Sequence, residues 1–144
     1  MKWLRKAADQ GYAQAQSELG SMYADGRGIP QNYPEAVKWW WKAADQEDVL
    51  AQTLIGAAYS EGQGVTQNYQ EAVKWFRKAA DQGHTSAQNN LGIAYTKGEG
   101  VPQNNVLAYM LFNLAATGGK KEAVHNRDAI QKKRLPLKLP KARS

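Results

Sequence analysis

The sequence contains no cysteine, so disulfide bonds and thiolate metal sites are excluded. A protein without thiols suits the cytosol and the periplasm equally, and its localisation therefore stays open. The first residues, Met1 to Lys6, include no apolar segment of signal-peptide length. The longest apolar run, Val106 to Ala116, is too short to span a bilayer and is interrupted by Asn113. We therefore expect no membrane insertion.

The sequence also lacks the residue patterns of catalytic sites. His84 and His125 have no partner at the spacing of a metal site or a catalytic triad. The paired glycines, such as Gly26 and Gly28, are not followed by the Lys-Ser/Thr of a phosphate-binding loop. A hydrolase, the enzymatic alternative, would need a nucleophile beside a base, and the sequence offers none. We expect neither an enzyme nor a bound metal or cofactor.

Basic charge is concentrated at the end of the chain. Nine of the 19 basic residues but only two of the 13 acidic ones lie from Lys120 onward, which gives this segment a net charge of +7 and the rest −1. The nine are Lys120, Lys121, Arg127, Lys132, Lys133, Arg134, Lys138, Lys141 and Arg143. The segment has no aromatic residue on which bases could stack, so only salt-dependent attraction to phosphates remains. Contact with nucleic acid or another anionic surface through this segment is the alternative function.

A fixed internal period dominates what the sequence does contain. Leu19-Gly20, Ile55-Gly56 and Leu91-Gly92 follow one another at intervals of 36 residues. A tyrosine, two glycines and a glutamine recur at the same interval: Tyr23, Tyr59, Tyr95; Gly26, Gly62, Gly98; Gly28, Gly64, Gly100; Gln31, Gln67, Gln103. A period of this length indicates a repeat architecture in which each unit is one supersecondary motif.

Each unit predicts two helices joined by a turn. Leu19 and Tyr23 lie on one face of the first helix, and Gly26 suits the left-handed conformation that ends a helix. Asn32 is the expected N-cap of the second helix, with Glu35 closing a capping box. The second helix buries small residues around one large ring: Ala36, Val37, Trp40, Ala43 and Ala44. The units therefore predict an all-α protein.

Two runs of residues carry a family resemblance. Ala-x-x-x-Leu-Gly-x-x-Tyr-x-x-Gly-x-Gly-Val-x-x-Asn and Ala-Val-Lys-Trp-Phe-x-Lys-Ala-Ala-Asp-Gln-Gly resemble the Sel1-like repeat (SLR), a relative of the tetratricopeptide repeat, over residues 1 to about 119. The resemblance implies a solenoid, a right-handed α-α superhelix of 36-residue helix-turn-helix repeats. It also implies a scaffold or adaptor that binds a peptide or protein partner, in bacteria often in signalling, envelope or host-contact roles.

We expect a single domain at 1–134 and divide it by the repeat register. The repeats fall at about 12–47, 48–83 and 84–119, after a partial unit at 1–11. A C-terminal capping helix is expected at about 120–133, because Arg127-Asp128 stand where the register requires Leu-Gly. Its Ala123, Val124 and Ile130 are the predicted cover for the apolar helix that begins near Val106. The remaining residues, 135–144, form a basic tail whose prolines exclude a regular helix.

The N-terminal end departs from the repeat pattern. Lys2 to Gly11 match Lys74 to Gly83, which is a second helix without its first. A solenoid needs a polar cap at each end, and here Trp3 and Leu4 would be partly uncovered. We therefore expect either that the chain is part of a longer repeat protein or that this end packs against a second copy.

The resemblance also implies where a partner binds, because the first helices of such repeats line the concave surface. Positions opposite their packing stripe vary between units, and we predict contacts there from Ser17, Glu18, Leu50, Thr53, Leu54, Ala57, Ser86, Asn89, Asn90 and Ile93. Leucine and isoleucine offer apolar anchors, and an asparagine amide can both donate and accept hydrogen bonds. The same variable face includes Asp25, Glu61 and Lys97. For each residue, the alternative is simple packing against the adjacent unit.

Trp41 is the one tryptophan outside the repeat pattern. It stands where Arg5 and Arg77 stand in the neighbouring units. We interpret it as an edge residue that covers a neighbouring helix, with a binding anchor as the alternative.

Overall fold

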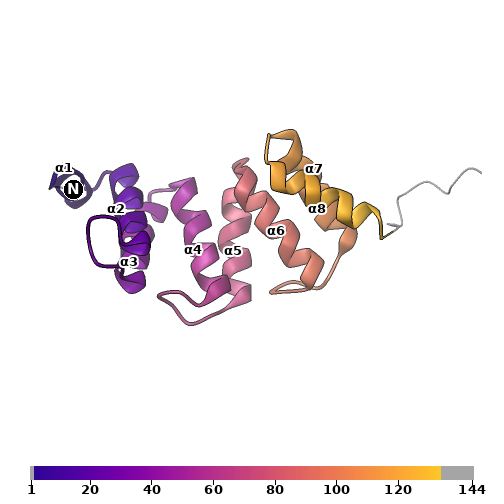
Figure 1. Ribbon diagram of the computed structural model, residues 1–144, viewed down its shortest axis with the longest axis horizontal. Coiled ribbons are helices and arrows are strands. Elements are labelled where there is room, and N and C mark those ends of the chain that lie inside the picture. Colours follow the sequence, from indigo (N-terminus) through magenta and orange to yellow (C-terminus); the bar gives the residue numbers. More distant parts are fainter. Residues whose placement is uncertain (1, 134–144) are drawn as a thin grey trace, which may run out of the picture.

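The structure, a computed structural model, describes residues 2–133, and the predicted basic tail at 135–144 lies outside them. The described residues form eight helices and no strands: α1 Lys2–Asp9, α2 Ala13–Asp25, α3 Tyr33–Ala44, α4 Val49–Glu61, α5 Tyr69–Asp81, α6 Thr85–Lys97, α7 Asn105–Thr117 and α8 Lys121–Gln131. Each helix packs mainly on the helices before and after it in the chain. Figure 1 shows them in chain order along the long axis, with α1 and α8 at opposite ends. The predicted all-α solenoid of helix-turn-helix repeats is confirmed.

The helix ends follow the repeated turn residues. A glycine with positive φ ends each first helix, at +69°, +68° and +71° for Gly26, Gly62 and Gly98. The side chain of Asn32 accepts a hydrogen bond from the backbone N–H of Glu35 at 3.1 Å, as predicted for an N-cap. The other hydrogen bond of the predicted capping box, from the Asn32 N–H to the Glu35 side chain, is wrong. The Asn32 N–H donates to the Tyr23 carbonyl at 2.8 Å instead. This bond holds the turn against the preceding helix.

Within each repeat a glycine of the first helix lies against a ring of the second. A Cβ added to Gly20, Gly56 or Gly92 would stand 2.6 Å from the side chain of Trp40, Phe76 or Phe112. These rings are between 2% and 5% exposed, so they fill the space that the missing side chains leave. The close approach fixes the spacing of the two helices in a repeat.

The two ends of the solenoid differ from its interior. Trp3 on α1 is 77% exposed, whereas Trp39 and Trp75 at the same repeat position are 4% and 6% exposed. At the other end, Ala123 and Ile130 of α8 are buried against the preceding helix, as predicted. Val124, which was also predicted to cover α7, is 37% exposed, so it contributes less to the core than Ala123 and Ile130.

Helix α7 has an exposed apolar face, because apolar residues stand at positions that face solvent in the other second helices. Its exposed residues are Leu107, Met110 and Leu114. In α3 the same repeat positions hold Glu35, Lys38 and Lys42, and in α5 they hold Glu71, Lys74 and Lys78. None of the helices in residues 2–133 is both long enough and apolar enough to cross a membrane.

Candidate functional site

Three of the predicted contact residues lie between repeats, not on the surface. Ser17, Thr53 and Asn89 are 2%, 6% and 2% exposed. Each forms a side-chain hydrogen bond with the following unit: Ser17 to Asp48 at 2.7 Å, Thr53 with His84 at 2.9 Å, and Asn89 from Asn126 at 2.9 Å. For these three the packing alternative holds, because their polar atoms are already paired inside the molecule.

His84, which stands alone in the sequence, takes part in this packing. Burial, and then the positive charge of Lys120, lower the pKa of His84 below the ordinary value of 6.5, while Asp48 opposes them. The imidazole is therefore neutral at neutral pH and hydrogen-bonded to Thr53. Within residues 2–133, His, Asp and Glu side chains do not gather in threes as they would around a metal ion.

Four other predicted residues line a row of hollows on the first helices. The first hollow lies among α2, α3 and α4, the second among α4, α5 and α6, and the third among α6, α7 and α8. Their volumes are about 290, 290 and 270 Å³. Leu54 and Ala57 line the first hollow, Ala57, Asn90 and Ile93 the second, and Ile93 the third.

Neighbouring hollows share lining residues, so the three hollows adjoin one another in a row, here called the groove. Ala57 and Glu61 of α4 line both the first and the second hollow. Ile93 and Lys97 of α6 line both the second and the third. A ligand that runs along the groove would therefore contact the same two repeat positions in successive units.

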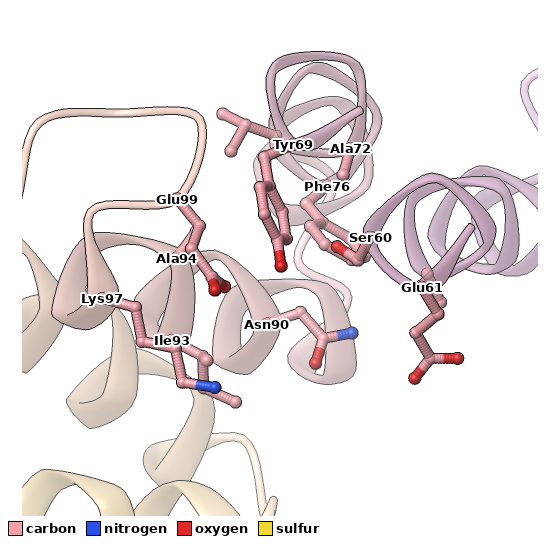
Figure 2. Close-up of a pocket in the computed structure, with 12 residues that line it drawn as sticks. Ser60, Glu61, Tyr69, Ala72, Phe76, Asn90, Ile93, Ala94, Lys97 and Glu99 are labelled. Carbon is pink, nitrogen blue, oxygen red and sulfur yellow. The ribbon is translucent and has the colours of Figure 1, made fainter. Parts of the chain in front are cut away.

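The second hollow combines apolar walls with groups that form hydrogen bonds. Figure 2 shows Tyr69 projecting from α5 with its hydroxyl directed toward the Asn90 side of the hollow. The negative charge of Glu99 is the main cause that raises the pKa of Tyr69 above 10.0, so the phenol stays protonated at neutral pH. Gln67 also donates a hydrogen bond to this hydroxyl, at 3.3 Å. The hollow thus offers a hydroxyl, an amide and carboxylates to a ligand.

Sequence reasoning missed one wall of the groove. It assigned contacts to the first helices alone, whereas Tyr33 and Tyr69 from the second helices and Glu99 from a turn also line the hollows. A signal was present, because the two tyrosines are 36 residues apart and each directly follows an N-cap asparagine.

The remaining predicted residues lie outside the groove. Leu50 is 49% exposed and Ser86 is half-buried, and neither lines the three hollows. Glu18 is exposed, forms an ion pair with Arg27 at 3.8 Å, and lines a separate hollow beside Tyr12 at the N-terminal end. The predicted residues therefore do not form one site, and only four of them share the groove.

Trp41 behaves as a covering residue. Its ring meets Trp75 of the following repeat edge to face, with centroids 4.9 Å apart and planes at 86°. At the equivalent positions Arg5 and Arg77 donate hydrogen bonds to the hydroxyls of Tyr23 and Tyr95, at 3.1 and 2.8 Å. The interpretation as an edge residue is therefore favoured over a binding anchor.

The basic segment is only partly described. Arg134, Lys138, Lys141 and Arg143 lie outside the described residues. Lys120 forms an ion pair with Glu122 at 3.7 Å, and Arg127 with Asp128 at 3.4 Å. Contact with an anionic surface through this segment stays a prediction.

Comparison with known protein families identifies one repeat along the chain. The family model for the Sel1 repeat matches residues 1–12, 13–48, 49–84 and 85–120. No curated protein sequence matches the chain.

Among solved structures, c5321, a protective antigen of uropathogenic Escherichia coli with an SLR fold, is 41% identical with a TM-score of 0.90. That match covers 94% of this chain but only 29% of the antigen, so the chain spans less than a third of that protein. A Sel1 repeat protein from Oxalobacter formigenes is 36% identical with a TM-score of 0.77, over 88% of this chain and 95% of that one. Helicobacter pylori cysteine rich protein B is 25% identical with a TM-score of 0.68, over 86% and 94%.

Proposed function

We propose, since this chain belongs to the Sel1 repeat family, that it is a non-enzymatic scaffold whose groove binds a peptide or a protein partner. Sel1 repeats generally mediate protein–protein interaction, and the family is generally non-catalytic. The partner is an extended segment or a helix of another protein, held along the first helices on the concave side.

The observation that carries this proposal is the row of adjoining hollows. Three hollows of similar volume follow one another, and Ala57 and Ile93 stand at the junctions between them. The residues at these positions differ from unit to unit, while the glycine and the ring beneath them keep the same close packing. This division supports a constant framework that presents a variable binding surface.

In this proposal the second hollow is the centre of the contact. Ile93 is the apolar anchor, and the Asn90 amide pairs with a peptide N–H or C=O group. Tyr69 adds an aromatic ring and a hydroxyl, a combination that is enriched in protein interfaces.

The test selects binding peptides from a random library with the wild-type chain and then measures their affinity for two variants. We expect the double variant Asn90→Ala, Ile93→Ala to lose at least about fivefold in affinity, because it removes the central polar and apolar contacts together. Leu50→Ala is the matched control, since Leu50 is exposed but lies outside the hollows. Equal binding of the selected peptides to the wild type and the double variant would show that the groove is not the site.

A second proposal concerns self-association through the N-terminal face. Trp3 is 77% exposed, and beside it Leu4, Ala7 and Ala15 line a hollow of about 500 Å³. In the interior, Trp39 is buried in a core cluster with residues of α1 and α2, and Trp75 in one with residues of α3 and α4. A second copy packed on this face would give Trp3 the same cover.

A further inference from the structure

One repeat position in the groove carries charges in a definite order. Asp25, Glu61, Lys97 and Lys133 are each 36 residues apart. Asp25 and Glu61 line the first hollow, Glu61 and Lys97 the second, and Lys97 and Lys133 the third. The charges along the groove therefore run from two acidic residues to two basic ones.

The residues one helical turn earlier carry no charge. They are Ser21, Ala57, Ile93 and Ala129, and each lines at least one of the hollows. Small or apolar groups thus lie beside the charged row along its whole length. The charge on the lining of the groove therefore comes from the charged row and from one further residue, which lies in a turn.

That further residue, Glu99, lines the second hollow on the same side as Lys97, across from Glu61 (Figure 2), and gives this hollow two acidic residues and one basic residue. Its carboxylate is the main reason that the pKa of Tyr69 is raised, which marks a negative potential between α5 and α6. Asp25 is partly compensated, because Arg27 lies 3.3 Å from its carboxylate. Among residues 2–133, Glu61, Glu99, Lys97 and Lys133 form no ion pair. Within that range, Glu61, Lys97 and Lys133 of the charged row are therefore not neutralised by a neighbouring ion pair, and Glu99 is engaged only with the Tyr69 hydroxyl.

We infer that the groove binds a peptide segment of mixed charge in one orientation, with its basic half over α2 and α4 and its acidic half over α6 and α8. The inference rests on the proposed function and adds the charge pattern of the partner. Complementary charges across an interface set orientation and reject wrong partners more than they add affinity. A uniformly acidic partner would meet Glu61 and Glu99, and a uniformly basic one would meet Lys97 and Lys133.

The first test compares two synthetic peptides of equal length and identical composition. The block peptide has lysines in its first half and glutamates in its second, and the alternating peptide interleaves the same residues. Both have the same net charge, so the overall positive charge of the chain cannot distinguish them. We expect the block peptide to bind at least about fivefold more tightly, since each exposed charge pair contributes roughly a two- to fivefold factor. The preference should weaken as salt is raised.

Orientation is read directly by nuclear magnetic resonance. A nitroxide at the lysine end of the block peptide should broaden the amide signal of Ser21 on α2 and leave that of Ala129 on α8 sharp. Reversing all four charges, with Asp25→Lys, Glu61→Lys, Lys97→Glu and Lys133→Glu, should exchange the two results. Lys38→Glu, an exposed change that lies outside the hollows, is the control and should alter neither.

The outcomes separate this inference from the proposed function. Equal affinity for the two peptides, or equal broadening of Ser21 and Ala129, overturns the inference. If library-selected peptides bind in the groove and ignore the four-charge reversal, the proposed function stands and the charge pattern falls. If neither synthetic nor library-selected peptides bind in the groove, both are wrong.

Discussion

Ser17, Thr53 and Asn89 occupy one repeat position, and their buried side chains link each unit to the next. Their partners change with them: serine bonds aspartate, threonine bonds histidine and asparagine bonds asparagine. A buried polar atom left without a partner costs about 1–3 kcal/mol, so each substitution at this position requires a matching one in the following unit. The position varies for a structural reason, although variation here had predicted a ligand contact.

The pairing of Thr53 with His84 predicts a pH dependence of stability. Because the pKa of folded His84 is lowered from 6.5, the unfolded state takes up the proton more readily. The contribution of neutral His84 is complete above the unfolded pKa of about 6.5 and is lost as the pH falls through the folded pKa. Between pH values of about 7.5 and 5.5, the wild type should therefore lose more unfolding free energy than His84→Gln.

Urea unfolding of both proteins across this pH range measures the difference. Titration of carboxylates is common to both chains, so the comparison isolates the histidine. Parallel profiles would mean that His84 titrates normally in the folded protein.

At the scale of helices, the sequence predicted the architecture because local and long-range requirements coincide. Gly26 ends a helix by its own conformational freedom, Asn32 caps the next one, and Gly20 accepts the ring of Trp40. Each requirement recurs at the same interval, so the period alone located the helices. The capping box failed because the Asn32 N–H has a stronger alternative, the Tyr23 carbonyl across the turn.

The candidate site was less predictable, for a physical reason. A position that varies between repeats is one where the fold accepts different side chains. It accepts them either because the side chain faces solvent or because the residue it contacts in the next repeat changes with it. Leu54 and Ile93 face the groove, whereas Thr53, next to Leu54, faces the next repeat. The repeat period locates the exposed face of a helix only to within one residue. A shift of one residue decides whether a side chain lines the groove or packs between repeats.

The fit between glycine and ring within a repeat gives a prediction for one helix pair. Gly92→Ala places a methyl group 2.6 Å from the ring of Phe112, and alanine's higher helix propensity returns only part of the loss. We expect the variant to unfold about 1–2 kcal/mol more easily in urea. Adding Phe112→Leu to Gly92→Ala should cost less than the sum of the two single changes, because the leucine leaves room for the methyl group. Additive losses, or a stable Gly92→Ala protein, would show that the ring can move aside freely.

At the scale of the whole molecule, the interior repeats make the same contacts, whereas the two ends of the solenoid lack some of them. Gln46 and Gln82, each just after a second helix, donate to Gln16 and Gln52 on the first helix of the same unit at 2.9 and 3.0 Å. Glycine stands at the next such position, residue 118, and the side-chain oxygen of Gln88 is buried without a hydrogen-bond partner among the described residues. The last repeat therefore lacks this link between its two helices, and it is also the repeat whose second helix, α7, has the exposed apolar residues.

The two exposed apolar faces, Trp3 on α1 and Met110 on α7, give competing predictions for self-association. Burying a large side chain is worth about 1.5–3 kcal/mol, and Trp3, which is 77% exposed, leaves more apolar surface to bury than Met110, which is 58% exposed. We expect the mass measured by light scattering to rise with concentration for the wild type and for Met110→Glu, and to stay at one chain for Trp3→Glu. Since both residues are exposed, neither change should alter the unfolding free energy by more than about 0.5 kcal/mol. Loss of association in Met110→Glu alone would move the interface to α7, and a wild-type monomer at every concentration would remove the second proposal.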